Sequence, residues 1–186
     1  LGTPNPNQLI YEMIRLDPKL TKMMICLSGQ HEMVIDFSGF RNFFTLHFFA
    51  KPIYNAYVLA SRLYENILPY HCDTDQVYVI PTRNELNQYR ILLTYSSEKF
   101  DESLETIRET VTLPADVIGK TAILYRIDRN TTNPYRLYEK KGMSAELTEE
   151  EIKLLREEGH MKPIDEFTVT DTLSLELTAN SVYMIE

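Results

Sequence analysis

The sequence predicts a mainly β protein, an antiparallel β-sandwich with a two-helix insertion, preceded by a helix–strand–helix segment. Three observations support this fold class. Seven short strand-like stretches, separated by turn residues, follow residue 76. Two pairs of helix start and stop signals lie between the fourth and fifth of these stretches. The first seventy residues instead show helical spacing on both sides of one short apolar run.

The amino-terminal segment is expected to hold two helices around a buried strand. The turn residues at 5–7 begin a helix over 8–16, and the continuous apolar run 22–27 is typical of a strand buried on both faces. An aromatic-rich connection over 37–49 leads to Pro52, where an amphipathic helix over 52–68 is predicted. A helix–strand–helix unit of this size cannot close a domain of its own. We therefore divide the chain into residues 1–70 and a β-sandwich domain over 71–186.

The carboxyl-terminal segment alternates apolar and polar residues at the period of β-strands. The stretch 121–128 is the clearest example, and 96–108, which is polar and charged, is interpreted as a surface loop with a helical turn. The predicted strands are 77–80, 89–95, 109–113, 121–128, 167–169, 173–177 and 182–185.

Two short helices interrupt this series of strands. Residues 130–134 break the preceding strand and supply a cap with proline at the first helical position, so a helix over 135–141 is expected to end at Gly142. Thr148 then begins a second helix, because a glutamate follows three residues later and acidic residues occupy its first turn. Gly159 ends that helix.

Composition and charge exclude several classes of function. A formal net charge of -8 with scattered Lys and Arg argues against nucleic-acid binding by this chain. No apolar run approaches the ~20 residues of a membrane span. The two cysteines, Cys26 and Cys72, have no metal-site spacing and fit free thiols in a reducing compartment. With no signal-peptide pattern at Leu1, we expect a cytoplasmic protein, cut from a longer one.

Spacing alone reveals no catalytic constellation. The loop after the buried strand offers Gln30, His31 and Glu32 as candidate substrate-binding residues, because ligands bind at the carboxyl ends of strands in α/β folds. The alternative is a solvent-facing loop without a role. His71-Cys72-Asp73 is interpreted as a linker, and His47, in the aromatic segment, as a hydrogen-bonded core histidine. We expect no catalytic residue, no metal site and no cofactor in this chain.

Several of these residues resemble the carboxyl-terminal part of glycoside hydrolase family 39, which includes β-xylosidases and α-L-iduronidase. The resemblance covers nearly the whole chain. It rests on a strand ending in aspartate, a Thr-Asn turn, two capped helices and two final strands. The residues that carry it are 125–128, Thr132, Asn133, Tyr138, Gly142, Thr148, Leu155, Arg156, 173–177 and 180–186, with Gly39, Phe40 and 51–57 upstream.

The resemblance implies an eight-stranded β/α barrel with a β-sandwich packed on it. Residues 8–16, 22–27 and 52–68 would then be the seventh helix, eighth strand and eighth helix of the barrel, and 76–186 the sandwich. Retaining hydrolysis needs two glutamates. The family carries them at the ends of the fourth and seventh strands, which would precede Leu1. This chain is therefore expected to be a non-catalytic portion of such a domain.

The chain departs from the family pattern at the eighth strand. Ile25 stands where an aromatic residue is expected, and Ser28-Gly29 replaces a Ser-Asp pair. An aliphatic side chain offers a sugar ring no flat stacking face. Family-39-like domains also occur in AraC-type transcriptional regulators, behind a DNA-binding segment. The lost stacking residue, the two free cysteines and the absence of a signal-peptide pattern fit such a cytoplasmic regulator.

Three functions remain open at this point. The first is a scaffold or sugar-sensing part of an AraC-type regulator. The second is the carboxyl-terminal part of an active β-xylosidase-like enzyme, and the third is a carbohydrate-binding β-sandwich. A carbohydrate is the expected ligand in each. Because barrel neighbours would normally cover the aromatic segment, we also predict that the isolated chain self-associates through residues 9–50, or that this region rearranges onto the sandwich.

Overall fold

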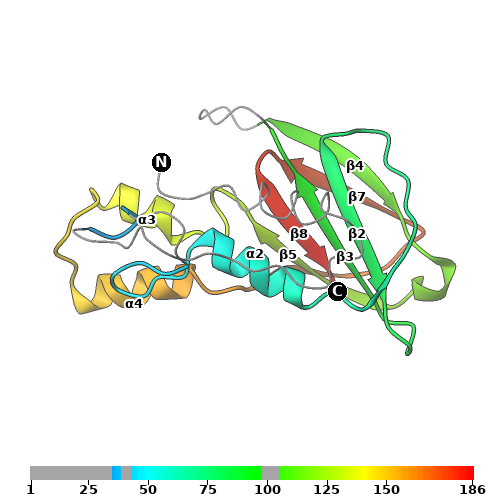
Figure 1. Cartoon of the computed structure of the whole chain (residues 1–186), viewed down its shortest axis with the longest axis horizontal. Helices are drawn as coiled ribbons and strands as arrows, with labels where there is room; N and C mark the ends of the chain where they lie inside the picture. The colour runs from blue at the N-terminus through cyan, green and yellow to red at the C-terminus, as the bar shows by residue number, and fades with distance from the viewer. Residues whose placement is uncertain (1–34, 39–42, 98–104) are drawn as a thin grey trace.

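Two antiparallel sheets form the larger part of the described chain (Figure 1). The computed structural model describes residues 35–38, 43–97 and 105–186. The larger sheet has six strands in the order β1-β2-β3-β8-β5-β6, and the smaller pairs β4 with β7. The strands are β1 (Asn66–Ile67), β2 (Val77–Arg83), β3 (Tyr89–Tyr95), β4 (Thr106–Thr112), β5 (Thr121–Ile127), β6 (Pro163–Thr168), β7 (Thr172–Thr178) and β8 (Ser181–Ile185).

The main core lies between the two sheets. Strand β3 directs Ile91, Leu93 and Tyr95 into it, and Leu175 and Leu177 enter from β7. The two strands alternate side chains between their faces, as the period of two requires. All five residues of β8 are buried, because this central strand is covered on both faces. The predicted mainly β fold with paired sheets is confirmed.

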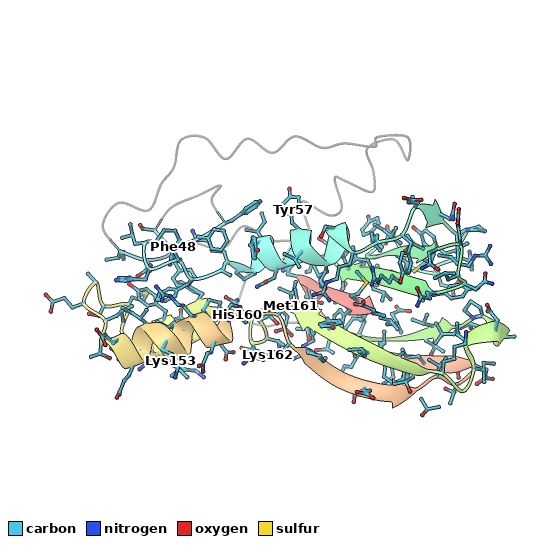
Figure 2. The ribbon with its side chains drawn as sticks, turned by 90° about the horizontal axis from the view of Figure 1, so that it is seen from below. Phe48, Tyr57, Lys153, His160, Met161 and Lys162 are labelled. Carbon is cyan, nitrogen blue, oxygen red and sulfur yellow. The ribbon has the colours of Figure 1, made fainter. Side chains whose placement is uncertain are left out.

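Helix α2 (Pro52–Ser61) covers the other face of the large sheet. Its Ala56 and Leu59 pack on Leu92 of β3 and on Val182 and Met184 of β8, which point away from the main core; Ile127 of β5 completes this second cluster. Figure 2 shows α2 lying along the sheet, with His160, Met161 and Lys162 in the link that passes beside it. Helix, sheet and second sheet thus form three successive layers.

The helical insertion extends from one end of the sheets (Figure 1). Helix α3 (Pro134–Lys140) begins at Asn133, whose side chain accepts a hydrogen bond from the Tyr135 N–H. Helix α4 (Glu149–Glu158) begins at Thr148 with a complete capping box. Both helices match the predicted insertion. Their inner faces bury Tyr138 and Leu155 against two aromatic residues of the amino-terminal connection, Phe37 and Phe49.

Two predicted elements are wrong in extent. The helix over 52–68 ends at Ser61, and residues 66–67 form strand β1 instead. The Tyr64 N–H donates to Thr82 Oγ1, and Ile67 pairs with Thr82 of β2, so pairing with a distant strand overrides the local helical pattern. The predicted loop over 96–108 also ends too late, because β4 begins at Thr106 and bonds along its length to β7.

The remaining strands match with small shifts at their ends. The largest shift is at β6, predicted over 167–169, which begins at Pro163 because its first residues pair with β5. The observed strands are thus longer than the predicted ones where a partner strand continues beside them. The expected helix 8–16 and strand 22–27 lie outside the described residues, and nothing tests the boundary at residue 70. Among the described helices none is long and apolar enough to cross a membrane.

Candidate functional site

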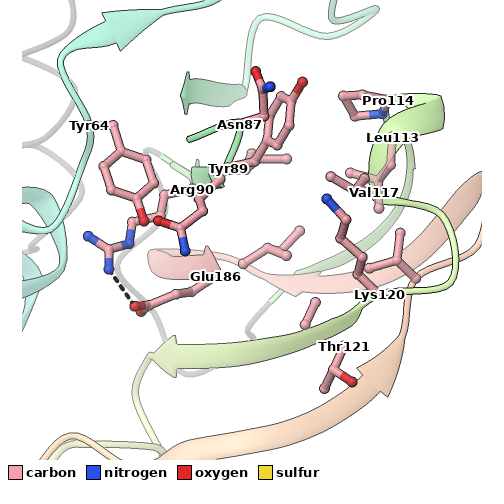
Figure 3. A pocket seen from close by; sticks show the side chains of 15 residues that line it. Tyr64, Asn87, Tyr89, Arg90, Leu113, Pro114, Val117, Lys120, Thr121 and Glu186 are labelled. Atoms are coloured by element: carbon pink, nitrogen blue, oxygen red, sulfur yellow. Dashed lines mark hydrogen bonds and ion pairs between the residues drawn. The ribbon is translucent and has the colours of Figure 1, made fainter. Parts of the chain in front are cut away.

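A cavity of about 320 Å3 opens at the end of the sandwich, where the β2–β3 turn faces the turn before β5 (Figure 3). The chain brings six separate segments to this cavity. They are the turn after α2, the start of β3, the short helix η1 (Ala115–Val117), the start of β5, the link between β6 and β7, and the end of the chain at β8. Its side chains are Tyr64, Asn87, Gln88, Tyr89, Arg90, Ile91, Leu113, Pro114, Val117, Lys120, Thr121, Ala122, Val169, Ile185 and Glu186.

One wall of the cavity is an ion-pair cluster around Glu186. Arg90 Nη2 lies 2.7 Å from Glu186 Oε1, and Arg62 Nη1 lies 3.3 Å from Oε2 of the same carboxylate. The Arg90 guanidinium also stacks on the Tyr64 ring at 4.4 Å and donates through Nη1 to the Arg62 carbonyl. Contacts on several sides hold the guanidinium in one position. Its Nε is buried, with no hydrogen-bond partner among the described residues.

The opposite wall joins the start of β3 to η1. The Tyr89 hydroxyl lies 3.1 and 3.2 Å from the two carboxylate oxygens of Asp116, which fixes the tyrosine ring across the gap between the two segments. Lys120 extends from the turn before β5 toward the same space in Figure 3. Leu113, Val117 and Val169 supply the apolar lining between the two polar walls. The cavity therefore combines an apolar floor with charged and amide groups, a composition typical of small-molecule sites.

A second polar cluster joins the aromatic connection to α4. His47 Nδ1 lies 2.6 Å from Oδ2 of the buried Asp36. The backbone N–H of His47 donates to Oδ1 of the same carboxylate at 3.0 Å. The His47 carbonyl accepts from Arg156 Nε and Nη2 at 3.2 and 3.1 Å. His47 is hydrogen-bonded as predicted, but its side chain is half-buried and does not lie in the core. Arg156 is exposed, and its guanidinium ties α4 to the aromatic connection.

The Asp128 motif that carries the family resemblance has a structural role. The buried carboxylate accepts from the Asn130 and Thr131 N–H groups at 2.7 Å each and pairs with Arg126 Nε at 2.9 Å. Asn133 then donates to the Asp128 carbonyl while capping α3. These bonds turn the chain from β5 into the helical insertion. The motif is thus explained by folding and assigns no reaction to the chain.

The predicted site and the observed cavity do not coincide. Gln30, His31 and Glu32 lie outside the described residues, so their substrate-binding role stays a prediction. Sequence reasoning did not identify Arg90, Lys120 or Glu186, because no local motif connects them. Among the described residues, no group of three His, Cys, Asp or Glu side chains is placed to hold a metal ion. His71 contacts Asp73 at 3.0 Å, both fully in solvent.

Comparison with known proteins detects similarity of structure only. No family model matches the sequence, and a search of curated proteins finds no relative. A glycoside hydrolase family 39 β-xylosidase from Caulobacter crescentus aligns over 82% of this chain and 31% of its own, with 21% identity and a TM-score of 0.63. A monomeric β-xylosidase from Caulobacter crescentus CB15 aligns over 82% and 34%, with 19% identity and a TM-score of 0.66.

A third solved structure shows a similar degree of structural likeness. The bacterial orthologue of human α-L-iduronidase aligns over 83% of this chain and 32% of its own, with 19% identity and a TM-score of 0.62. The chain thus spans about a third of the length of these enzymes. Identities at this level indicate a shared fold and nothing finer. The chain has the fold of a part of the glycoside hydrolase family 39 enzymes.

Proposed function

We propose that this chain is the non-catalytic carboxyl-terminal portion of a family-39-like domain, acting as scaffold and sugar sensor in a cytoplasmic AraC-type transcriptional regulator. The observation that carries the proposal is the fold shared with family 39 enzymes over about a third of their length. The sequence resemblance implies that this third is the carboxyl-terminal one, which in the family carries neither of the two catalytic glutamates.

The scaffold role is supported by the attachment of α2 to the sheet. Leu59 is fully buried against the large sheet, and Asn55 Nδ2 donates to the Gly159 carbonyl at 2.8 Å, at the end of α4. On the family arrangement, α2 corresponds to the last helix of the barrel. A helix held both by the sheet and by the insertion would fix the sandwich rigidly to the barrel that precedes it.

A sensing role is supported by the chemistry of the cavity. Retaining hydrolysis requires two carboxyl groups about 5 to 5.5 Å apart. Glu186 is the one carboxylate among the described residues that line the cavity, and two arginines neutralise it. Such a site can bind a ligand but lacks the groups to cleave a glycosidic bond. Ile25 and Gly29, at the positions that contact the sugar in the family, favour the same role.

The proposal is tested on the full-length parent protein. Gel-shift assays with the DNA upstream of its gene are expected to show binding that changes when a xylose-containing sugar is added. The same preparation is expected to release no nitrophenol from p-nitrophenyl β-xyloside, beside an authentic β-xylosidase as positive control. Nitrophenol release without DNA binding would overturn the proposal in favour of an active β-xylosidase-like enzyme.

A further inference from the structure

We propose that the cavity between Arg90 and Lys120 binds a sugar acid, meaning a monosaccharide that carries a carboxylate. The choice of a sugar rests on the proposed sensing function. The choice of an acid rests on the charges around the cavity. The site lies at the end of the sandwich beside the turn that follows α2, on residues of that turn, β3, η1, β5 and β8.

The size of the cavity limits the ligand to about one sugar ring. Its volume of about 320 Å3 lies at the lower end of the ~300–1,000 Å3 range of small-molecule sites. The apolar residues between the walls, Leu113, Val117 and Val169, would cover the C–H face of a ring. Asn87 and Gln88 are exposed amides at the edge, with donors and acceptors for hydroxyl groups. An oligosaccharide could place one terminal residue inside.

The charges favour an anionic ligand. Three charged side chains line the cavity, and two of them, Arg90 and Glu186, neutralise each other at 2.7 Å. Lys120, an exposed lysine, has no ion pair among the described residues, and its ammonium gives the lining a net positive charge in a chain of net charge -8. Asp116, which holds Tyr89, and Arg62, which pairs with Glu186, carry opposite charges and leave that balance unchanged. A carboxylate placed beside Lys120 would gain a charge-assisted hydrogen bond. A hydroxyl of a neutral sugar could accept a hydrogen bond from the same ammonium but would form no ion pair with it.

The polar walls are already held in place before a ligand enters. The Tyr89 hydroxyl is bound by Asp116, and the Arg90 guanidinium is fixed between Tyr64 and Glu186. Groups fixed in advance lose little side-chain entropy on binding. The site is therefore suited to a small, rigid ligand.

Calorimetric titration of the 186-residue chain tests the inference with D-glucuronate, D-glucose and acetate as probes. Glucuronate is expected to bind at least tenfold more tightly than the other two, and more weakly as salt is raised. Lys120→Gln should weaken glucuronate binding at least tenfold. Lys162→Gln, an exposed lysine away from the cavity, is the matched control and should leave binding unchanged. Circular dichroism confirms that both variants are folded.

Several outcomes would overturn the inference. Absence of heat with glucuronate, equal affinity for glucose or acetate, or unchanged binding by the Lys120→Gln variant would remove the sugar-acid site. If the chain binds glucuronate but the full-length parent binds no DNA, the proposed regulator function is refuted and the sugar-acid site stands. A parent whose DNA binding responds to a neutral sugar, with no glucuronate binding, would remove the site and leave the regulator.

Discussion

The packing of α2 on the large sheet is tested by Leu59→Ala. Leu59 is fully buried in the cluster formed with Leu92, Val182 and Met184. Leu→Ala changes in protein cores cost about 2 to 5 kcal/mol, and more where the surroundings cannot collapse into the cavity. Because this side chain lies between a helix and the two central strands of a sheet, little collapse is possible. We expect the free energy of unfolding to fall by about 3 kcal/mol.

Urea unfolding followed by circular dichroism measures this loss. With a slope m of about 2 kcal/mol/M, the midpoint would fall by about 1.5 M. Leu154→Ala on α4 is the matched control, since it makes the same change on a helix at a side chain that is 46% exposed. Its effect should stay within about 0.5 kcal/mol. A Leu59→Ala variant as stable as the control would refute the attachment of α2 to the sheet, and the scaffold role with it.

Three further perturbations test other parts of the molecule. Hydrogen bonds from the Thr148 N–H, then from Lys141 and the Thr148 hydroxyl, lower the pKa of Glu151 from an ordinary 4.5 to about 2. The stability that Glu151 contributes to the folded chain is therefore fully present above pH 4.5 and is lost as the pH falls to about 2. The acid unfolding of the Glu151→Gln variant should lack this dependence on pH. Asp128→Ala should cost about 3 kcal/mol in urea unfolding and Asp128→Asn less, since an amide keeps one acceptor; equal losses would contradict this. The predicted self-association should weaken in Phe48→Asn, because Phe48 is 73% exposed and asparagine suits its φ of 61°. A wild-type chain that light scattering finds strictly monomeric would refute it.

The sequence predicts best the features that neighbouring residues determine. The start of α4 is one case, since the Thr148 hydroxyl and the Glu151 carboxylate satisfy each other's backbone N–H groups within a single turn. The strand over 121–127 is another, where alternation is visible in seven residues. The order of the strands is not local. No pattern in the sequence indicates that β8 lies between β3 and β5, because that pairing is decided by which faces bury each other.

The cavity could not be predicted for the same reason. Arg90 and Glu186 are separated by 96 positions, and each has an ordinary local context at the end of a strand. Tyr64 falls within the predicted helix over 52–68, but the helix ends three residues before it. Its ring instead stacks on Arg90. A charged site assembled from the ends of several strands gives no signal in a single sequence, whereas a capped helix does.

The cavity and α2 are joined by direct contacts, which bears on both proposed roles. Arg62 directly follows the last residue of α2 and is its C-cap. Its guanidinium pairs with Glu186, and its carbonyl accepts a hydrogen bond from Arg90. The Arg62 guanidinium also lies over the Tyr125 ring of β5, at 4.9 Å. A ligand that draws Arg90 or Glu186 toward itself must therefore stretch contacts that hold the end of α2. In a protein where α2 closes a barrel, this chain of contacts would let an occupied cavity bias the position of the barrel's last helix, which a sensor requires and a passive scaffold does not.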